Sequence, residues 1–187
     1  MTLSAASAIH ADEQVMRKSN SSSHVSAIVL APKIPQKGYV GDVYLDVMAP
    51  GSFAHAGSLF GFTTTHGAMV TERHFVGLGA GYLRDFSAEE GIIPIYAEGR
   101  IYFPSASVHR IYPHIGMRLG GIYATQGGGG VYGTLACGIR VPVSTSLALN
   151  VEIGPQVTTK YNRTSYGADF SSDGMHIGFF GRIGLEF

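Results

Sequence analysis

Apolar and polar residues alternate with a period of two along most of the chain after Lys37, and this pattern limits the possible folds more than any other feature. Successive side chains of a β-strand point to opposite faces, so the alternation predicts strands with one apolar and one polar face. The segments that carry it are longer than the five or six residues of an ordinary strand. They are residues 38–48, 58–70, 75–85, 92–103, 111–124, 131–142, 147–158 and 175–187.

The number and length of these segments predict an all-β fold, an eight-stranded antiparallel up-and-down transmembrane β-barrel. A tilted strand crosses a bilayer with about 9–11 residues, and each segment is long enough to do so. The connections after the second, fourth and sixth segments are mostly shorter than the others. Because periplasmic turns of such barrels are short and the outer loops longer, this difference favours the same fold. Residues 37–187 are expected to form the barrel domain.

The polar faces carry nearly all the charge of the predicted strands. Buried charges are costly unless they are paired, so acids on these faces are expected to lie within salt-bridge reach of arginines. Near mid-height, Glu98 is expected beside Arg118, and Glu152 beside Arg182. The residues of this predicted interior charge network are Asp42, Asp46, Glu98, Arg100, Arg118, Arg140, Glu152, Arg182 and Glu186.

Alternation alone does not say which face points inward, and a soluble lipocalin-like barrel would bury the apolar face. Three features favour an inward polar face: it is rich in glycine, its charges are few and balanced, and it has no lysine. The faces of residues 58–70 stay open, because two phenylalanines precede a polar run there. The apolar residues expected to point outward include Val43, Leu45, Ile95, Leu119, Leu149, Ile183 and Leu185.

The first 36 residues differ from the rest. Residues 1–11 are small and mildly apolar, which predicts the remnant of a secretion signal with cleavage after Ala8 or Ala11, although a positive n-region is lacking. The following stretch contains the run Ser19–Ser23 and two prolines, which indicates a linker of low order. Residues 1–36 are therefore expected to contribute no strand to the barrel.

Several kinds of chemistry find little support in the sequence. Thirteen basic and thirteen acidic residues cancel, so no basic field indicates nucleic acid. His114 and His176 are expected at opposite ends of the barrel and so cannot share a metal ion. Gly127–Gly130 is no phosphate loop, because neither a lysine nor a helix follows it. A His followed two residues later by a Ser occurs only at His24 and Ser26, before the barrel. We expect neither an enzyme nor a cofactor.

Four stretches together resemble a known group of proteins. They are Lys37–Tyr39, Thr64–Gly67, Phe75–Gly81 and Ile93–Arg100, and they are similar to small outer-membrane β-barrel proteins of the Bacteroides lineage, of the OmpA-like eight-stranded type. The resemblance covers residues 38–187 and implies an exported outer-membrane barrel without shared catalytic residues. Ile183, Leu185 and Phe187 are similar to the C-terminal signal that the barrel-assembly machinery reads.

These observations favour a non-enzymatic protein of the bacterial outer membrane with a plugged polar interior and a structural or surface-interaction role. Its expected partners are outer-membrane lipid and, during biogenesis, the barrel-assembly machinery. No nucleic acid is expected, and no particular surface partner is indicated. The alternative is a soluble lipocalin-like barrel that binds a small apolar ligand.

Overall fold

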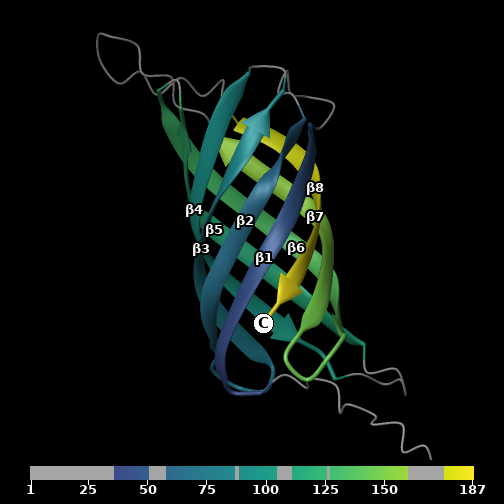
Figure 1. Cartoon of the computed structure of the whole chain (residues 1–187). Coiled ribbons are helices and arrows are strands. Elements are labelled where there is room, and N and C mark those ends of the chain that lie inside the picture. Colours follow the sequence, from purple (N-terminus) through teal and green to yellow (C-terminus); the bar gives the residue numbers. More distant parts are fainter. Residues whose placement is uncertain (1–35, 51–57, 87–88, 105–110, 126, 160–174) are drawn as a thin grey trace, which may run out of the picture. The chain divides into compact units, whose positions relative to one another are not determined.

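The computed structural model describes residues 36–50, 58–86, 89–104, 111–125, 127–159 and 175–187. Each strand pairs antiparallel with its sequence neighbour and the last pairs with the first, which closes the sheet into a barrel (Figure 1). The strands are β1 (Gly38–Pro50), β2 (Leu59–Met69), β3 (His74–Asp85), β4 (Glu90–Tyr102), β5 (Tyr112–Ala124), β6 (Gly129–Pro142), β7 (Ala148–Thr159) and β8 (Met175–Glu186).

The predicted eight-stranded antiparallel up-and-down barrel is confirmed, and each strand begins and ends within two residues of its predicted bounds. Among the described residues, no helix is long and apolar enough to cross a membrane. Residues 1–35 lie outside the described part of the chain. The signal remnant and linker predicted for residues 1–36 therefore stay a prediction.

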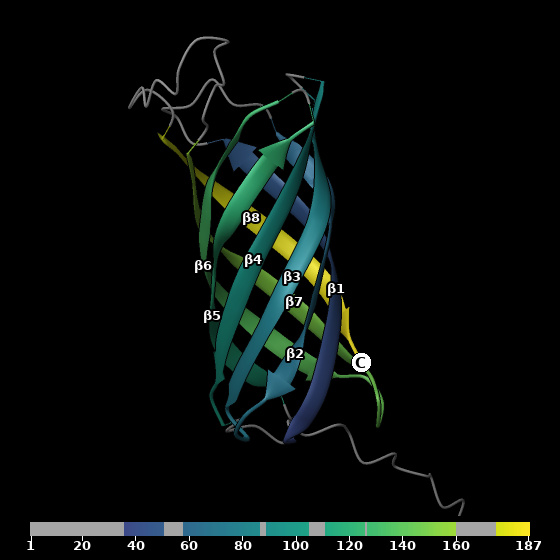
Figure 2. The same cartoon turned by 90° about the vertical axis from the view of Figure 1, so that its left-hand side faces the viewer.

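The strand register is staggered around the barrel. A path that steps from each residue to its paired neighbour starts at Val40, passes Glu98 and Arg118, and returns to β1 at Pro50. It arrives ten residues further along the strand than it began. This stagger tilts the strands against the barrel axis, as Figure 2 shows. A barrel of eight strands has an interior just wide enough for its own side chains. We call the end where β1 begins and β8 ends the terminal end, and the opposite end the distal end.

The apolar strand faces point outward. Six of the seven residues predicted to be outward and exposed are 46–55% exposed. Val43 is the least exposed of them and Leu119 the most. Leu149 also lies on the outer face but is half-buried, because it pairs in register with Leu185 on one side and Val141 on the other. Large apolar residues therefore cover the outside of the barrel, and most polar residues of the strands point into it.

The faces of β2, which the sequence left open, are resolved by its pairing with β1 and β3. Phe60, Phe62 and His66 are exposed on the outer face, whereas Thr63 and Thr65 are fully buried inside. The strand thus follows the same period of two as the other seven. Its outer face differs from theirs in carrying a histidine within the apolar belt.

Two apolar layers fill the interior near its ends. At the terminal end, Val40, Met69, Phe75 and Tyr102 form one buried cluster. At the distal end, a larger cluster combines Met48, Leu83, Tyr96, Ile122, Tyr132, Ala136 and Phe180. Sequence analysis did not assign these layers, because it treated the inner face as polar throughout. The nine residues of the predicted charge network lie between them, whereas buried Asp85 and Glu90 lie at the distal ends of β3 and β4.

Aromatic side chains gather on the outer face near both ends of the barrel. Near the distal end the exposed ones include Phe60, Tyr82 and Tyr123, and near the terminal end they include Tyr39 and Phe187. Rings of aromatic residues at the two membrane–water interfaces flank the apolar band of transmembrane barrels. The outer surface therefore has the zones that a bilayer requires.

Candidate functional site: the charge layer inside the barrel

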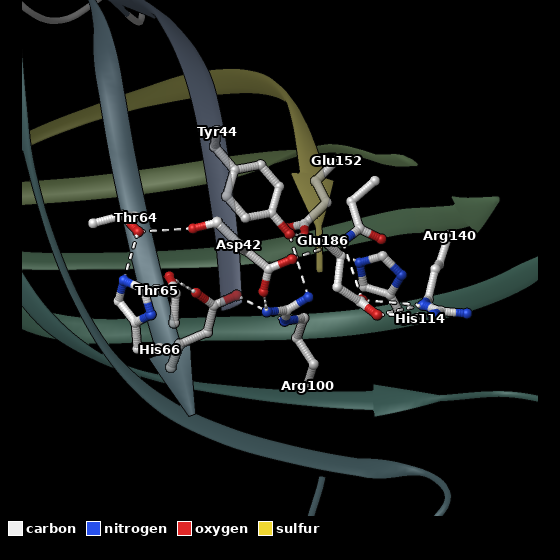
Figure 3. Close-up of polar contacts among 12 residues, drawn as sticks. Asp42, Tyr44, Thr64, Thr65, His66, Arg100, His114, Arg140, Glu152 and Glu186 are labelled. Carbon is white, nitrogen blue, oxygen red and sulfur yellow. Dashed lines mark hydrogen bonds and ion pairs between the residues drawn. The ribbon is translucent and has the colours of Figure 1, made fainter. Parts of the chain in front are cut away.

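All nine residues of the predicted charge network point into the barrel, and each is at most 3% exposed. They come from six strands: β1, β4, β5, β6, β7 and β8. We call this group, together with the polar side chains that bond to it, the charge layer. Figure 3 shows the part around Asp42, Arg100 and Glu152.

Glu98 on β4 lies between two arginines. It pairs in register with Arg118 on β5, whose Nε donates to Glu98 Oε2 over 2.9 Å. Arg100 Nε lies 3.0 Å from the other carboxylate oxygen, and the Thr65 hydroxyl donates to Oε2 over 2.8 Å. The carboxylate therefore lies between two guanidinium groups, and its Oε2 accepts both hydrogen bonds.

Glu152 on β7 is the second centre of the layer. It pairs in register with Arg182 on β8, which donates to Glu152 Oε2 from Nε over 2.8 Å and also from Nη2. The Tyr44 hydroxyl of β1, two strands away, donates to Oε1 over 2.9 Å, and His114 Nε2 lies 3.1 Å from the same oxygen. Three strands besides β7 thus meet at one carboxylate.

The two aspartates of β1 join the layer by different contacts. Asp42 forms an ion pair with Arg100, and Asn150 Nδ2 donates to its Oδ1 over 3.0 Å. Asp46 accepts a hydrogen bond of 2.7 Å from the Thr63 hydroxyl. Arg118 Nη1 lies 3.9 Å from Asp46, so this ion pair is a loose one.

Arg140 and Glu186 form a pair on the terminal side of the layer. Arg140 Nη2 lies 2.8 Å from Glu186 Oε1, and its Nε is 3.0 Å from both carboxylate oxygens. Asn150 Nδ2 reaches Glu186 Oε2 over 3.4 Å and also donates to Asp42. The Asn150 amide therefore connects this pair to the rest of the layer.

Aromatic rings cover the guanidinium groups. Arg100 lies 4.1 Å from the centre of the Phe75 ring, and Arg118 lies 4.4 Å from that of Tyr96. Arg182 lies 5.0 Å from the Tyr44 ring. A planar guanidinium stacks on aromatic faces and is less strongly hydrated than an ammonium group, which explains why the interior uses arginine.

The sequence did not indicate six polar members of the layer: Tyr44, Thr63, Thr65, Tyr102, His114 and Asn150. The alternation places Tyr44, Tyr102, His114 and Asn150 on the polar faces of their strands, so their position in the strand was the available signal. The threonines belong to the segment with open faces. His114 was expected to stand apart near one end, but the narrow interior lets it reach Glu152.

The charges of the layer balance with one proton. Its five carboxylates face four guanidinium groups, and His114 stands against Glu152. With a neutral His114 the layer carries one negative charge. It is electrically neutral when the His114–Glu152 pair holds one proton more than a neutral imidazole beside an ionised carboxylate. Within the described residues, no group of three or more His, Cys, Asp and Glu side chains is placed to hold a metal ion.

Eleven buried side-chain atoms in and beside the layer have no hydrogen-bond partner in the described part of the chain. Eight belong to the layer itself, Glu98 Oε1 and Arg182 Nη1 among them, and the others are the hydroxyls of Tyr132 and Thr134 and the side-chain oxygen of Gln156. Buried polar groups of this kind are usually bridged by ordered water. We therefore expect individual waters next to the ion pairs.

Gly138 on β6 makes room for the His114–Glu152 pair. A Cβ at this position would lie 2.6 Å from Glu152 Cγ and 2.7 Å from His114 Nε2. Gly138→Ala is therefore expected to lower the free energy of unfolding by about 1–3 kcal/mol through overpacking. Urea unfolding in phospholipid vesicles, followed by circular dichroism, measures this change.

Gly181 on β8 provides the control, because it points outward and the atom nearest to an added Cβ is Ile153 Cγ2 at 3.9 Å. Gly181→Ala is expected to leave the free energy of unfolding nearly unchanged. Equal losses in the two alanine variants would contradict the tight packing around Gly138.

A closed barrel with an apolar exterior and paired charges inside defines a class, that of the transmembrane β-barrels. Similar solved structures include Neisserial surface protein A, at 14% identity and a TM-score of 0.56, over 79% of this chain and 94% of that one. A de novo designed transmembrane β-barrel has 17% identity and a TM-score of 0.47, over 82% of this chain and 98% of the design.

The N-terminal β-barrel domain of Pseudomonas aeruginosa OprF matches at 14% identity and a TM-score of 0.43, over 81% of this chain and 100% of that one. No protein-family model and no curated protein matches the chain. At 14% identity, the likeness to the Neisserial protein concerns the fold alone.

Proposed function

We propose that this chain is a non-enzymatic β-barrel of a bacterial outer membrane, with an interior plugged by the charge layer and a structural or surface-interaction role. The observation that carries the proposal is the direction in which the strand faces point: the apolar faces form an outer belt, and the faces with paired charges point inward. A bilayer has no water to satisfy backbone groups, so a closed barrel is one of the two structures that can span it.

The same orientation weighs against the soluble lipocalin-like alternative. Such a barrel would turn apolar residues inward around its ligand and polar ones to water. Here residues such as Leu78 and Phe62 are more than half exposed, whereas Arg118 and Glu152 are buried. An apolar exterior this continuous would associate in water.

The terminal end is proposed to face the periplasm. Its connections comprise residues 70–73, 103–111 and 143–147, and those of the distal end comprise residues 51–58, 86–89, 125–128 and 160–174. The longest connection is distal, which agrees with longer loops outside the cell. Ile183, Leu185 and Phe187 point outward on β8 and beyond it. They remain the proposed signal for the barrel-assembly machinery.

Two further features of the proposal rest on the sequence alone. One is the Bacteroides lineage, which the quoted stretches indicate. The other is export by a signal whose remnant occupies the first residues, with residues 37–187 as the mature barrel domain. Mass spectrometry of the exported protein is expected to find a start after Ala8 or Ala11.

Planar-bilayer recording tests the plugged interior. The buried charge network and the two apolar clusters inside the barrel support the proposed plug, so the inserted protein is expected to show no steady conductance. Insertion is checked separately by protection of the barrel from protease in vesicles. Stable single-channel currents from fully inserted protein would contradict the plug and favour a role in passage of solutes.

A further inference from the structure

The charge layer contains one more carboxylate than guanidinium groups. Five acids face four arginines, and all nine side chains are buried. Apolar clusters lie on both sides of the layer along the barrel. A buried charge without a partner is costly, so the additional negative charge requires a positive one close by.

His114 on β5 is placed to supply this charge. Among the histidines whose side chains the structure describes, it alone is buried. Its Nε2 lies 3.1 Å from Oε1 of Glu152, and both side chains are shielded from solvent. Gly138 on β6 leaves the space for this approach, because a Cβ there would lie 2.7 Å from Nε2. The fold thus brings an ionisable ring against a carboxylate inside the layer.

The contacts of Glu152 indicate that an extra proton belongs on the imidazole and not on the carboxylate. The Tyr44 hydroxyl accepts a hydrogen bond of 3.3 Å from Arg100 Nη1 and donates one of 2.9 Å to Glu152 Oε1. Arg182 donates to Glu152 Oε2 through two nitrogens. Both carboxylate oxygens therefore accept hydrogen bonds, as an ionised carboxylate does.

The surroundings of the His114 ring favour its charged form. Neither ring nitrogen has a hydrogen-bond partner in the described part of the chain, so the contact with Glu152 acts through charge and not through a directed hydrogen bond. A neutral imidazole would gain little from such a contact. The Tyr102 ring of β4 lies 5.1 Å away between ring centres, close enough to attract a cation.

Two positive charges close to His114 already have carboxylate partners. Arg100 and Arg140 occupy the next inward positions on the neighbouring strands β4 and β6. Arg100 forms an ion pair with Asp42, and Arg140 forms one with Glu186. Their charges are thus matched within the layer, which limits the repulsion that an imidazolium would meet.

The other two arginines are shared between acids. Arg182 on β8 contacts Glu152, and its Nη2 also lies 3.7 Å from Glu98. Arg118 on β5 contacts Glu98 and, at 3.9 Å, Asp46. The four guanidinium groups therefore leave the five carboxylates incompletely compensated, and a charged imidazole beside Glu152 completes the balance.

We propose that His114 is a proton-binding site of the folded barrel, and that its imidazolium is the fifth positive charge of the layer. Folding is then coupled to the uptake of one proton, because an imidazole in an unfolded chain loses its second proton near about pH 6.5. The interior becomes a pH-sensitive element. Release of the proton at higher pH leaves a net negative charge between the apolar clusters and destabilises the barrel.

Nitrogen NMR of the full-length protein in nanodiscs tests the proposal. The protein carries isotope-labelled histidine, and the chemical shifts of the two ring nitrogens distinguish an imidazolium from either neutral tautomer. The His114 signals are identified by their absence in His114→Gln. At about pH 7.5, above the range in which an unperturbed imidazole titrates, both ring nitrogens of His114 are expected to carry a proton. A neutral ring would overturn the proposal.

Glu152→Gln tests whether the charge balance is the cause. The amide oxygen still accepts the hydrogen bond from Tyr44, and the layer then has four carboxylates for four guanidinium groups. His114 is expected to lose its extra proton in this variant at the same pH. Glu72→Gln, at an exposed acid in the turn after β2, is expected to keep the imidazolium. An imidazolium that persists in Glu152→Gln, or disappears in Glu72→Gln, would contradict the site.

The unfolding equilibrium gives a second readout, which decides even where Glu152→Gln does not fold. Between about pH 7 and pH 8 the equilibrium constant for unfolding in vesicles is expected to rise several-fold, up to the roughly tenfold limit of one linked proton. His114→Gln is expected to remove most of this rise. His74→Gln, at an exposed histidine, is expected to retain it. An unchanged rise in His114→Gln, or no rise in the unaltered protein, would refute the coupling of the proton to folding.

Discussion

Replacing Arg182 with methionine is expected to lower the free energy of unfolding by about 3–5 kcal/mol, because it leaves buried Glu152 without its guanidinium partner. Arg182 is 3% exposed and donates to Glu152 through two nitrogens. His114 and Tyr44 remain beside the carboxylate but supply no permanent positive charge. Urea unfolding in phospholipid vesicles measures the loss.

Two variants make this result specific to the buried charge. Combining Arg182→Met with Glu152→Gln removes both charges, and is expected to recover most of the stability, since a buried pair itself contributes little net stabilisation. Arg84→Met alters an exposed arginine of β3 and is expected to change stability by less than about 0.5 kcal/mol. A loss of about 1 kcal/mol or less in Arg182→Met would mean that the charges are separately hydrated in a wet lumen.

An arginine in the middle of the outer belt is expected to have the second large effect. Leu135 lies halfway along β6 and is 52% exposed. Leu135→Arg is expected to destabilise the protein in vesicles by about 2–4 kcal/mol, because the charge must be held at the bilayer midplane. The same unfolding measurement detects it.

The dependence of this destabilisation on the position of the arginine along β6 discriminates better between a membrane-spanning and a soluble barrel. Val143 is also exposed, but it lies just beyond the terminal end of β6, so Val143→Arg is expected to cost about 0–1 kcal/mol. In a soluble barrel both residues would face water and both arginines would be harmless. Equal and small effects at the two positions would therefore contradict the membrane-spanning orientation.

Much of this architecture could be predicted from the sequence because side-chain direction in a strand depends only on whether a position is odd or even. The alternation therefore identified eight strands and separated the two faces of seven, and the glycine, the balanced charges and the absence of lysine on the polar faces indicated that these point inward. It was uninformative on β2, where Thr63–Thr65 are polar on both faces. There the pairing with β1 and β3 decides which threonines are buried.

The register of neighbouring strands could also be approached from the sequence, because hairpin connections limit how far two strands slide. Counting from the turns places Glu98 opposite Arg118 and Glu152 opposite Arg182. The apolar layers at the two ends were not anticipated. Phe75 and Leu83 lie at inward positions of β3, and their odd residue numbers already placed them on that face. The inner face was nevertheless treated as uniformly polar.

Contacts across the barrel were decided by the tertiary structure alone. Tyr44 meets Glu152, and Asn150 meets Asp42, 108 residues apart in each case and on strands that are not neighbours. These meetings depend on the closure of the barrel, which leaves only β8 between β1 and β7, and on the stagger of the strands, which brings these residues to the same height.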